Sequence, residues 1–184
     1  MMRTRRQWIF LIGFSGSGKS SVGRELAKRL KCRFDDLDIL IEKHAGRSIP
    51  EIFERSGENA FRKLESEALI SLLARNKAGV VALGGGAFES KLIRSWTKAH
   101  GLTVFLSCSM RELHRRLRSS TDRPLLKVTP RAGSTVRQTA LARIRTLLSK
   151  RLGNYRRADL MLSTTNRTVA QAARELARKL EMSR

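Results

Sequence analysis

Cysteines, aromatic residues and long apolar runs are all scarce in this chain of 184 residues. Its two cysteines, Cys32 and Cys108, form no CxxC pair and have no histidine at metal-ligand spacing. We therefore expect idle thiols in a reducing, cytoplasmic compartment. No apolar run approaches the roughly 20 residues that span a bilayer, so we expect no membrane association. The start, MMRTRRQWIFLIGF, lacks a small-residue cleavage site. It indicates a basic tail, residues 1–7, that leads into a buried strand.

Acidic residues are also few, and the chain has a formal net charge of +22. Residues 1–100 carry 19 Lys and Arg against 11 Asp and Glu, whereas residues 101–184 carry 19 against 5. Such a surface attracts polyanions without specificity. However, aromatic residues make up only 5% of the chain, and no finger, homeodomain or RNP signature is present. We therefore expect a solvated basic exterior around an anion-binding site, and no specific nucleic-acid partner.

Short apolar runs alternate with longer helical patterns along the chain. Strand candidates are residues 8–13, 32–38, 79–86, 102–108 and 159–165, and helix candidates are 20–30, 38–46, 48–57, 58–76, 89–100, 109–120, 135–158 and 168–182. This order predicts an α/β fold with a five-stranded parallel sheet and helices on both faces. No repeat or domain boundary interrupts residues 1–184, so we expect one domain. The long irregular stretch at about 119–134 predicts a mobile lid.

A glycine-rich loop joins the first strand candidate to the first helix candidate. Residues 13–20 read GFSGSGKS and fit the pattern GxxxxGK[ST], in the strand-to-helix context that the motif requires. In such a loop, backbone N–H groups and the helix dipole hold phosphates. Lys19 can reach the β- and γ-phosphates, and Ser20 can ligate Mg²⁺. The predicted ATP-binding residues of this loop are Gly13, Ser15, Gly16, Ser17, Gly18, Lys19, Ser20 and Ser21.

Three acids, Asp35, Asp36 and Asp38, gather in FDDLD at the end of the second strand candidate. A nucleotide with Mg²⁺ needs a nearby carboxylate, and the other strand that would supply one ends in LGGGA. Asp36 is therefore the best candidate to orient metal-bound water or to accept the proton of an attacking hydroxyl. Asp38 would lie on the same face of the strand and hold a hydroxyl. The alternative is that these acids cap the next helix, a role that we expect for Asp35.

Three further features fit an anionic second substrate. In FRKLE, Arg62 and Glu65 are three residues apart, so the acid can orient the arginine towards a carboxylate. A surface ion pair is the alternative. The glycines at 84–86 favour a close approach of backbone to a ligand, although a plain turn uses the same residues. Arg151 lies at the end of the long helix that follows the expected lid.

These motifs, in this order, resemble the shikimate kinase family over about residues 8–180. The resemblance rests on GFSGSGKS, DLD, IEKHAGRSIPEIFERSGENAFRKLE, LGGGA, RPLL and KRLGNYRRAD. It implies a three-layer P-loop kinase fold similar to nucleoside monophosphate kinases, with a shikimate-binding segment at about 35–65. It also implies that ATP, with one Mg²⁺, phosphorylates the 3-hydroxyl of shikimate in aromatic amino acid biosynthesis. We expect the protein to be a monomer.

The resemblance also assigns roles to matching residues. Arg62 and Arg151 would pair with the shikimate carboxylate, and Asp38 would bind ring hydroxyls. Asp36 would lie near the attacking hydroxyl and reach Mg²⁺ through water. Arg123, in RPLL, would swing from the lid onto the transferring phosphate. The implied shikimate-binding set is Asp38, Arg62, Gly84, Gly85, Gly86 and Arg151.

The adenine side of the site matches the family pattern less closely. The family has one arginine before the lid and another after the last strand. Before the lid, Arg115, Arg116 and Arg118 compete for the first position, and we name Arg116. After the last strand, TTNRT offers Arg167.

Two rival functions stay open at this stage. The first is a kinase of the same fold for another hydroxy acid, such as gluconate. The second is a non-catalytic relative that senses a ligand, which the basic surface favours. The intact set of substrate residues argues against the first rival, and the complete phosphate loop argues against the second.

Overall fold

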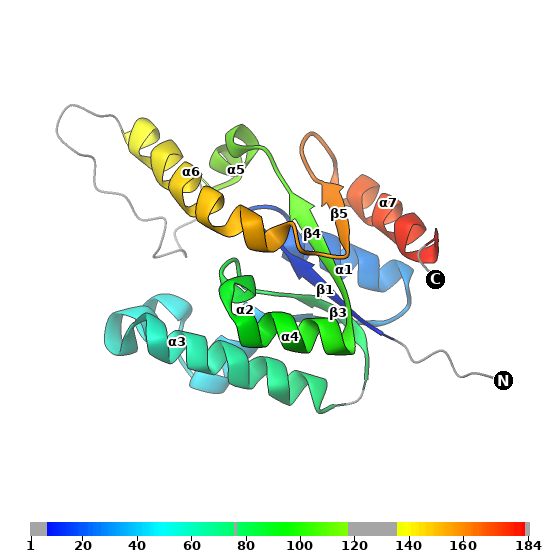
Figure 1. Ribbon diagram of the computed structural model, residues 1–184, viewed down its shortest axis with the longest axis horizontal. Coiled ribbons are helices and arrows are strands. Elements are labelled where there is room, and N and C mark those ends of the chain that lie inside the picture. Colours follow the sequence, from blue (N-terminus) through cyan, green and yellow to red (C-terminus); the bar gives the residue numbers. More distant parts are fainter. Residues whose placement is uncertain (1–6, 76, 118–135, 183–184) are drawn as a thin grey trace.

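The computed structural model describes residues 7–75, 77–117 and 136–182 of the chain (Figure 1). The expected lid and Arg123 lie outside these residues, as do residues 1–6 of the basic tail. The strands are β1 (Trp8–Ile12), β2 (Arg33–Asp36), β3 (Gly79–Ala82), β4 (Gly101–Ser107) and β5 (Leu160–Ser163). The helices are α1 (Lys19–Arg29), α2 (Leu37–Ala45), α3 (Ile49–Leu73), the 3-10 helix η1 (Ala87–Glu89), α4 (Lys91–His100), α5 (Met110–Leu117), α6 (Val136–Tyr155) and α7 (Val169–Met182).

The five strands form one parallel sheet in the order β2-β3-β1-β4-β5. This confirms the sheet that the alternating pattern predicted. β1 lies at the centre, and all five residues of its run WIFLI are buried. A continuous apolar run is what a parallel strand needs when helices cover both of its faces. The order also places the end of β3 beside the end of β1, where the phosphate loop begins.

Alternate side chains of β1 enter two separate apolar clusters, because successive residues of a strand point to opposite faces. Phe10 and Ile12 pack with side chains from α3, α4 and α6. Leu11 packs with side chains from α1 and α7. The fold is therefore a sheet between two helical layers, the three-layer P-loop kinase arrangement (Figure 1). Among the described residues, the helices are too short or too polar to span a membrane.

Helix α3 joins two helical segments at Gly57, whose φ of 78° and ψ of 177° are not helical. The sequence predicted separate segments on either side of this residue. At its start, Ser48 and Glu51 form a capping box, in which the Glu51 carboxylate accepts from the Ser48 N–H at 2.8 Å. Because the helix bends at Gly57, residues from both segments, including Phe53 and Arg62, line one pocket.

The end of β2 differs from the prediction. The strand ends at Asp36, and Asp38 lies in the first turn of α2, so the two acids do not share a strand face. Asp36, and not Asp35, caps the helix: its Oδ1 accepts from the Asp38 N–H at 3.1 Å. Asp35 is buried in the strand, and its carboxylate lies 3.5 Å from the Arg33 guanidinium.

The strand stops early because the spacing of buried apolar residues changes from that of a strand to that of a helix. Leu37 and Ile41, which are four residues apart, are both buried.

Candidate active site

The chain between β1 and α1 forms the phosphate loop that the motif predicts. Gly16 and Gly18 have φ values of 81° and 95°, which glycine adopts without a steric cost. The amino group of Lys19 folds back over the loop and donates to the carbonyls of Gly13 at 2.9 Å and Phe14 at 3.1 Å. The lysine is therefore held at the N-terminus of α1, where backbone N–H groups attract an anion.

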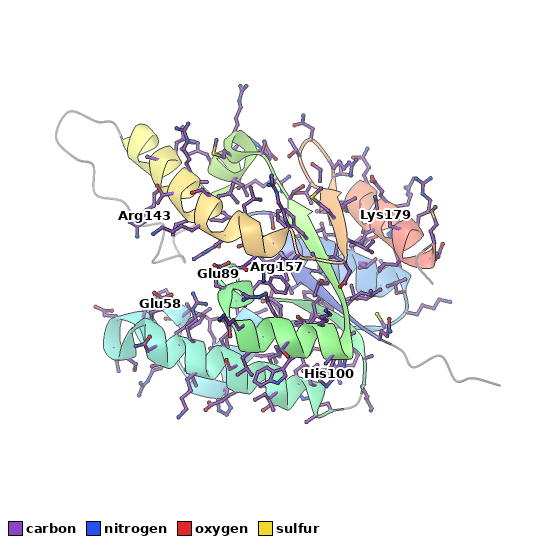
Figure 2. All side chains as sticks on the ribbon, in the orientation of Figure 1. Glu58, Glu89, His100, Arg143, Arg157 and Lys179 are labelled. Carbon is purple, nitrogen blue, oxygen red and sulfur yellow. The ribbon has the colours of Figure 1, made fainter. Side chains whose placement is uncertain are left out.

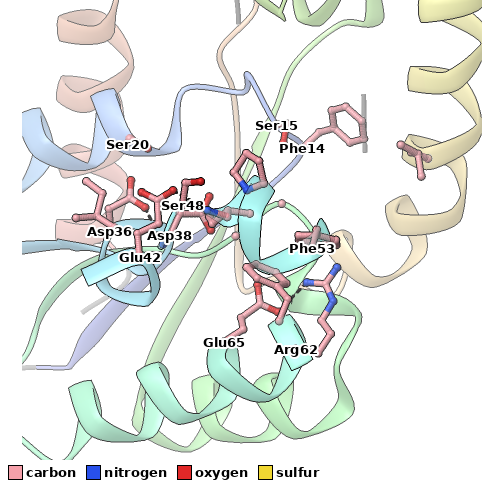
Figure 3. Close-up of a pocket in the computed structure, with 18 of the residues that line it drawn as sticks. Phe14, Ser15, Ser20, Asp36, Asp38, Glu42, Ser48, Phe53, Arg62 and Glu65 are labelled. Atoms are coloured by element: carbon pink, nitrogen blue, oxygen red, sulfur yellow. Dashed lines mark hydrogen bonds and ion pairs between the residues drawn. The ribbon is translucent and has the colours of Figure 1, made fainter. Parts of the chain in front are cut away.

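Two pockets meet beside this loop. The first, with a volume of about 520 Å³, extends from the loop to Arg62 (Figure 3), and Arg151 also lines it. The second, of about 410 Å³, lies over the loop and the start of α1. Ser20, Asp36 and Asp38 line both pockets. A group bound in one pocket can therefore reach a group bound in the other.

The shared wall of the pockets carries several oxygen atoms that can bind a metal ion. The Ser20 hydroxyl and the carboxylates of Asp36 and Asp38 all reach it, on elements that converge from α1, β2 and α2. Oxygen donors of this kind are the ligands that Mg²⁺ prefers, usually one or two from the protein beside phosphate oxygens and water. The residues predicted to bind the metal, Ser20 and Asp36, fit such an ion.

Arg62 lies at the far end of the first pocket and is held by two acids of α3. Its Nη1 is 2.8 Å from Oε2 of Glu65, and its Nη2 is 3.0 Å from Oε1 of Glu58. The pair with Glu65 is not a surface contact, because the Glu65 side chain is fully buried. This burial raises the pKa of the Glu65 carboxyl to about 7; Arg62 opposes that rise, and nearby Asp38 adds to it.

The three glycines after β3 make room for side chains that converge from different elements. A Cβ atom on any of them would crowd a predicted site residue or its partner. The nearest groups would be Glu65 Oε1 at 2.6 Å and Asp38 Oδ1 at 2.9 Å for Gly84, Ser15 Oγ at 3.1 Å for Gly85, and Arg62 Nη2 at 2.5 Å for Gly86. This stretch is therefore more than a plain turn, because its missing side chains leave room for the side chains that line the first pocket.

Helix α6 brings two side chains to the same glycine stretch. Arg151 donates from Nη1 to the Gly85 carbonyl at 3.1 Å, and its guanidinium lies 5.8 Å from the ring centre of Phe14. The hydroxyl of Tyr155 donates to the same carbonyl, and its ring stacks on Phe105 at 5.1 Å between centroids. The sequence predicted Arg151 but missed Tyr155. The available signal was its position one helical turn after Arg151, on the same face.

Of the three arginines that compete before the lid, Arg116 is the one in the second pocket. It donates to the carbonyls of Gly16 at 3.3 Å and Thr164 at 2.9 Å. Both Arg115 and Arg116 pair with Glu112, but Arg115 is 70% exposed and lines neither pocket. Arg118 lies outside the described residues.

The end of β5 closes the second pocket. Arg167 lines this pocket and pairs with Glu175 at 2.9 Å. Thr164, which the sequence analysis missed, donates from its hydroxyl to the Ser17 carbonyl at 2.9 Å. No motif marks this buried threonine, because its contact spans 147 residues.

Comparisons with known proteins show the family of this chain. The family model described as shikimate kinase matches residues 15–181. A shikimate kinase from Chlorobium chlorochromatii is 41% identical over 181 residues, which cover 98% of this chain and 94% of the relative. The structure of shikimate kinase from Acinetobacter baumannii in complex with shikimate matches with a TM-score of 0.88 and 33% identity, covering 97% of this chain and 94% of that chain. The shikimate kinase structure from Aquifex aeolicus matches with a TM-score of 0.79 and 34% identity, covering 95% and 96%. The chain belongs to the shikimate kinase family.

Proposed function

We propose that this protein transfers the γ-phosphate of ATP to the 3-hydroxyl of shikimate, forming shikimate 3-phosphate and ADP. One observation carries the proposal: a phosphate-loop pocket and the pocket that contains Arg62 and Arg151 share a wall made by Ser20, Asp36 and Asp38. Direct transfer requires a hydroxyl and a terminal phosphate held a few ångströms apart in a fixed orientation. Two adjoining pockets provide that arrangement.

ATP would occupy the second pocket. The phosphate loop and Lys19 would hold its phosphates, and its base would lie between Arg116 and Arg167. Ser20 would ligate one Mg²⁺ directly, and Asp36 would reach the ion through water. A bound Mg²⁺ would neutralise charge on the phosphate oxygens.

Shikimate would occupy the first pocket. Its carboxylate would lie between Arg62 and Arg151, which approach the glycine stretch from α3 and α6. Two guanidinium groups bind a carboxylate strongly, and a neutral sugar would offer them no negative charge in its place. Asp38 would accept hydrogen bonds from ring hydroxyls. These bonds would direct the 3-hydroxyl towards the shared wall.

At that wall, Asp36 would accept the proton of the 3-hydroxyl as its oxygen attacks the γ-phosphorus and ADP leaves. The charge on the transferring phosphate would be balanced by Lys19 and by Arg123 of the lid. Arg123 is assigned from the RPLL motif, because the lid at about 119–134 lies outside the described residues.

The remaining expectations belong to the same proposal. The chain would act as one domain, residues 1–184, whose segment at about 35–65 binds shikimate. That segment supplies Asp38, Arg62 and Glu65 to the first pocket. The protein would work as a cytoplasmic monomer, with no specific nucleic-acid partner and no membrane partner.

A coupled assay for ADP release tests the proposal. Mg²⁺ and ATP are supplied with shikimate, with gluconate, or with neither, and the Lys19→Ala variant serves as the inactive control. Turnover that depends on shikimate and is absent with gluconate is expected. Turnover with gluconate would favour the rival kinase, and ATP binding without turnover on either compound would favour a ligand sensor.

A further inference from the structure

The carbonyl oxygen of Gly85 accepts hydrogen bonds from two side chains of α6. Arg151 donates to it at 3.1 Å, and the hydroxyl of Tyr155 donates to it as well. The same residue packs against the phosphate loop, since a Cβ on Gly85 would lie 3.1 Å from Ser15 Oγ and 3.3 Å from the Ser15 nitrogen. This one peptide unit therefore touches the elements that build both pockets.

Of the two donors to the Gly85 carbonyl, only Arg151 is also proposed to bind substrate. Under the proposed function, Arg151 binds the carboxylate of shikimate, and any shift of its guanidinium towards that group would weaken its bond to the Gly85 carbonyl. A polar group that loses its partner in a partly buried site opposes that movement. Arg151 would therefore bind substrate more weakly if it were the only donor to this carbonyl.

Tyr155 is placed so that its own bond to Gly85 persists. Its side chain is 1% exposed, and its ring is held against Phe105. A tyrosine in such a setting has little rotamer freedom. Burial raises the pKa of its hydroxyl, with Arg151 opposing that rise, so the group stays protonated and remains a donor at physiological pH.

We propose that Tyr155 is a positioning residue, whose hydroxyl holds the Gly85 carbonyl and thereby releases Arg151 to bind the substrate carboxylate. The inference rests on the proposed function and extends it to a residue that does not itself touch substrate. It also predicts that the glycine stretch keeps its place against Ser15 while Arg151 moves. Nucleotide binding should therefore not depend on the Tyr155 hydroxyl.

The variant Tyr155→Phe tests this role, because it removes the hydroxyl and keeps the ring on Phe105. We expect the KM for shikimate to rise roughly tenfold, the scale of one hydrogen bond to a polar group. The kcat at saturating shikimate and the KM for ATP should stay within about twofold of the wild type. Circular dichroism and the melting temperature check that the variant is folded.

A double-mutant cycle shows whether Tyr155 acts through Arg151. In the Arg151→Ala background no guanidinium remains to be released, so adding Tyr155→Phe should change the KM for shikimate by less than about twofold. Phe105→Leu is the matched control, because it loosens the ring packing and leaves the hydroxyl in place. This control should lower the melting temperature without a selective change in the KM for shikimate.

Three results would overturn the inference. The first is an unchanged KM for shikimate in Tyr155→Phe, and the second is a change in both KM values together with a lower melting temperature, as in a purely structural role. The third is full additivity with Arg151→Ala. The proposed function fails separately, because the wild-type protein in the same assay would then show no turnover that depends on shikimate.

Discussion

The carboxylate of Asp36 accepts a hydrogen bond from the backbone N–H of Asp38 at 3.1 Å. Asp36 is thus the N-cap of α2, and both acids line both pockets. The cap fixes where the chain turns from strand to helix, and it places two carboxylates at the junction where the phosphate would be transferred. A structural role and a proposed catalytic role therefore fall on one side chain, and suitable variants can separate them.

Asp36→Asn should reduce kcat on the order of 100-fold or more, because an amide cannot accept the proton of the attacking hydroxyl. Asparagine is as good an N-cap as aspartate, so the melting temperature should change little. Steady-state kinetics and thermal unfolding measure the two effects. Asp35→Asn, one residue away and outside both pockets, is the control and should keep its kcat. A change in substrate affinity alone would contradict the proposed role.

Lys19→Ala should lower kcat on the order of 10³-fold, because the ammonium group is the cation held over the phosphate loop. Lys28→Ala is the matched control: it removes a lysine from the exposed side of the same helix. The coupled assay and direct measurement of nucleotide binding compare the two variants. Near-normal turnover in Lys19→Ala would refute the assignment of the phosphate loop.

Gly86→Ala should raise the KM for shikimate about tenfold or more, because the new Cβ would lie 2.5 Å from Arg62 Nη2 and displace the guanidinium. The KM for ATP should stay the same, since the three atoms nearest to the new Cβ all belong to Arg62 and none to the phosphate loop. Gly153→Ala, in the last turn of α6 with open space around it, is the control. It should stabilise the protein by about 0.5–1 kcal/mol and leave both KM values unchanged.

The raised pKa of Glu65 predicts a pH-dependent stability. The carboxyl titrates near 4.5 in the unfolded chain and at about 7 in the folded protein, where burial disfavours its charge. Between these values the folded state binds more protons, so the free energy of unfolding falls as pH rises. The contribution is complete below pH 4.5 and lost above about pH 7. Its size is on the order of 3 kcal/mol.

Glu65→Gln cannot ionise and should lack this fall. Urea unfolding of both proteins from pH 4.5 to 8 measures the difference between them. If the free energy of unfolding changed with pH in the same way for both proteins, Glu65 would titrate at an ordinary pKa. The exposed Glu58, which also pairs with Arg62, offers the control Glu58→Gln, which should keep the wild-type pH dependence.

Figure 2 shows how widely charged side chains cover the surface, with labelled examples such as Arg143 on α6, Arg157 in the turn after it and Lys179 on α7. The sequence analysis expected this basic exterior from a net charge of +22. The phosphate loop, Asp36 and the glycines at 84–86 lie at the carboxyl ends of β1, β2 and β3, where an α/β sheet binds its ligands.

The phosphate loop, the parallel sheet and the pairing of Arg62 with Glu65 were all predictable from the sequence. Each depends on residues that are close along the chain: a contiguous loop, an apolar period within one element, or two positions one helical turn apart. Backbone hydrogen bonds and side-chain spacing act over these short separations, so the pattern carries the information. The prediction that Asp36 and Asp38 share one face of a strand was wrong, and the reason is also local. At Asp36 the chain can either continue the strand or cap the next helix, and the sequence pattern did not separate the two.

The tertiary structure alone decided which distant residues meet. The strand order places the glycines after β3 beside the phosphate loop after β1, and the packing of α6 brings Tyr155 to Gly85, 70 residues away. Thr164 reaches Ser17 only because β5 and the loop lie at the same edge of the sheet. Such contacts depend on the packing of whole elements around a shared core, and no local pattern specifies them. The sequence by itself therefore determined the elements and the chemistry of their ends, and the packed sheet determined how those ends form one site.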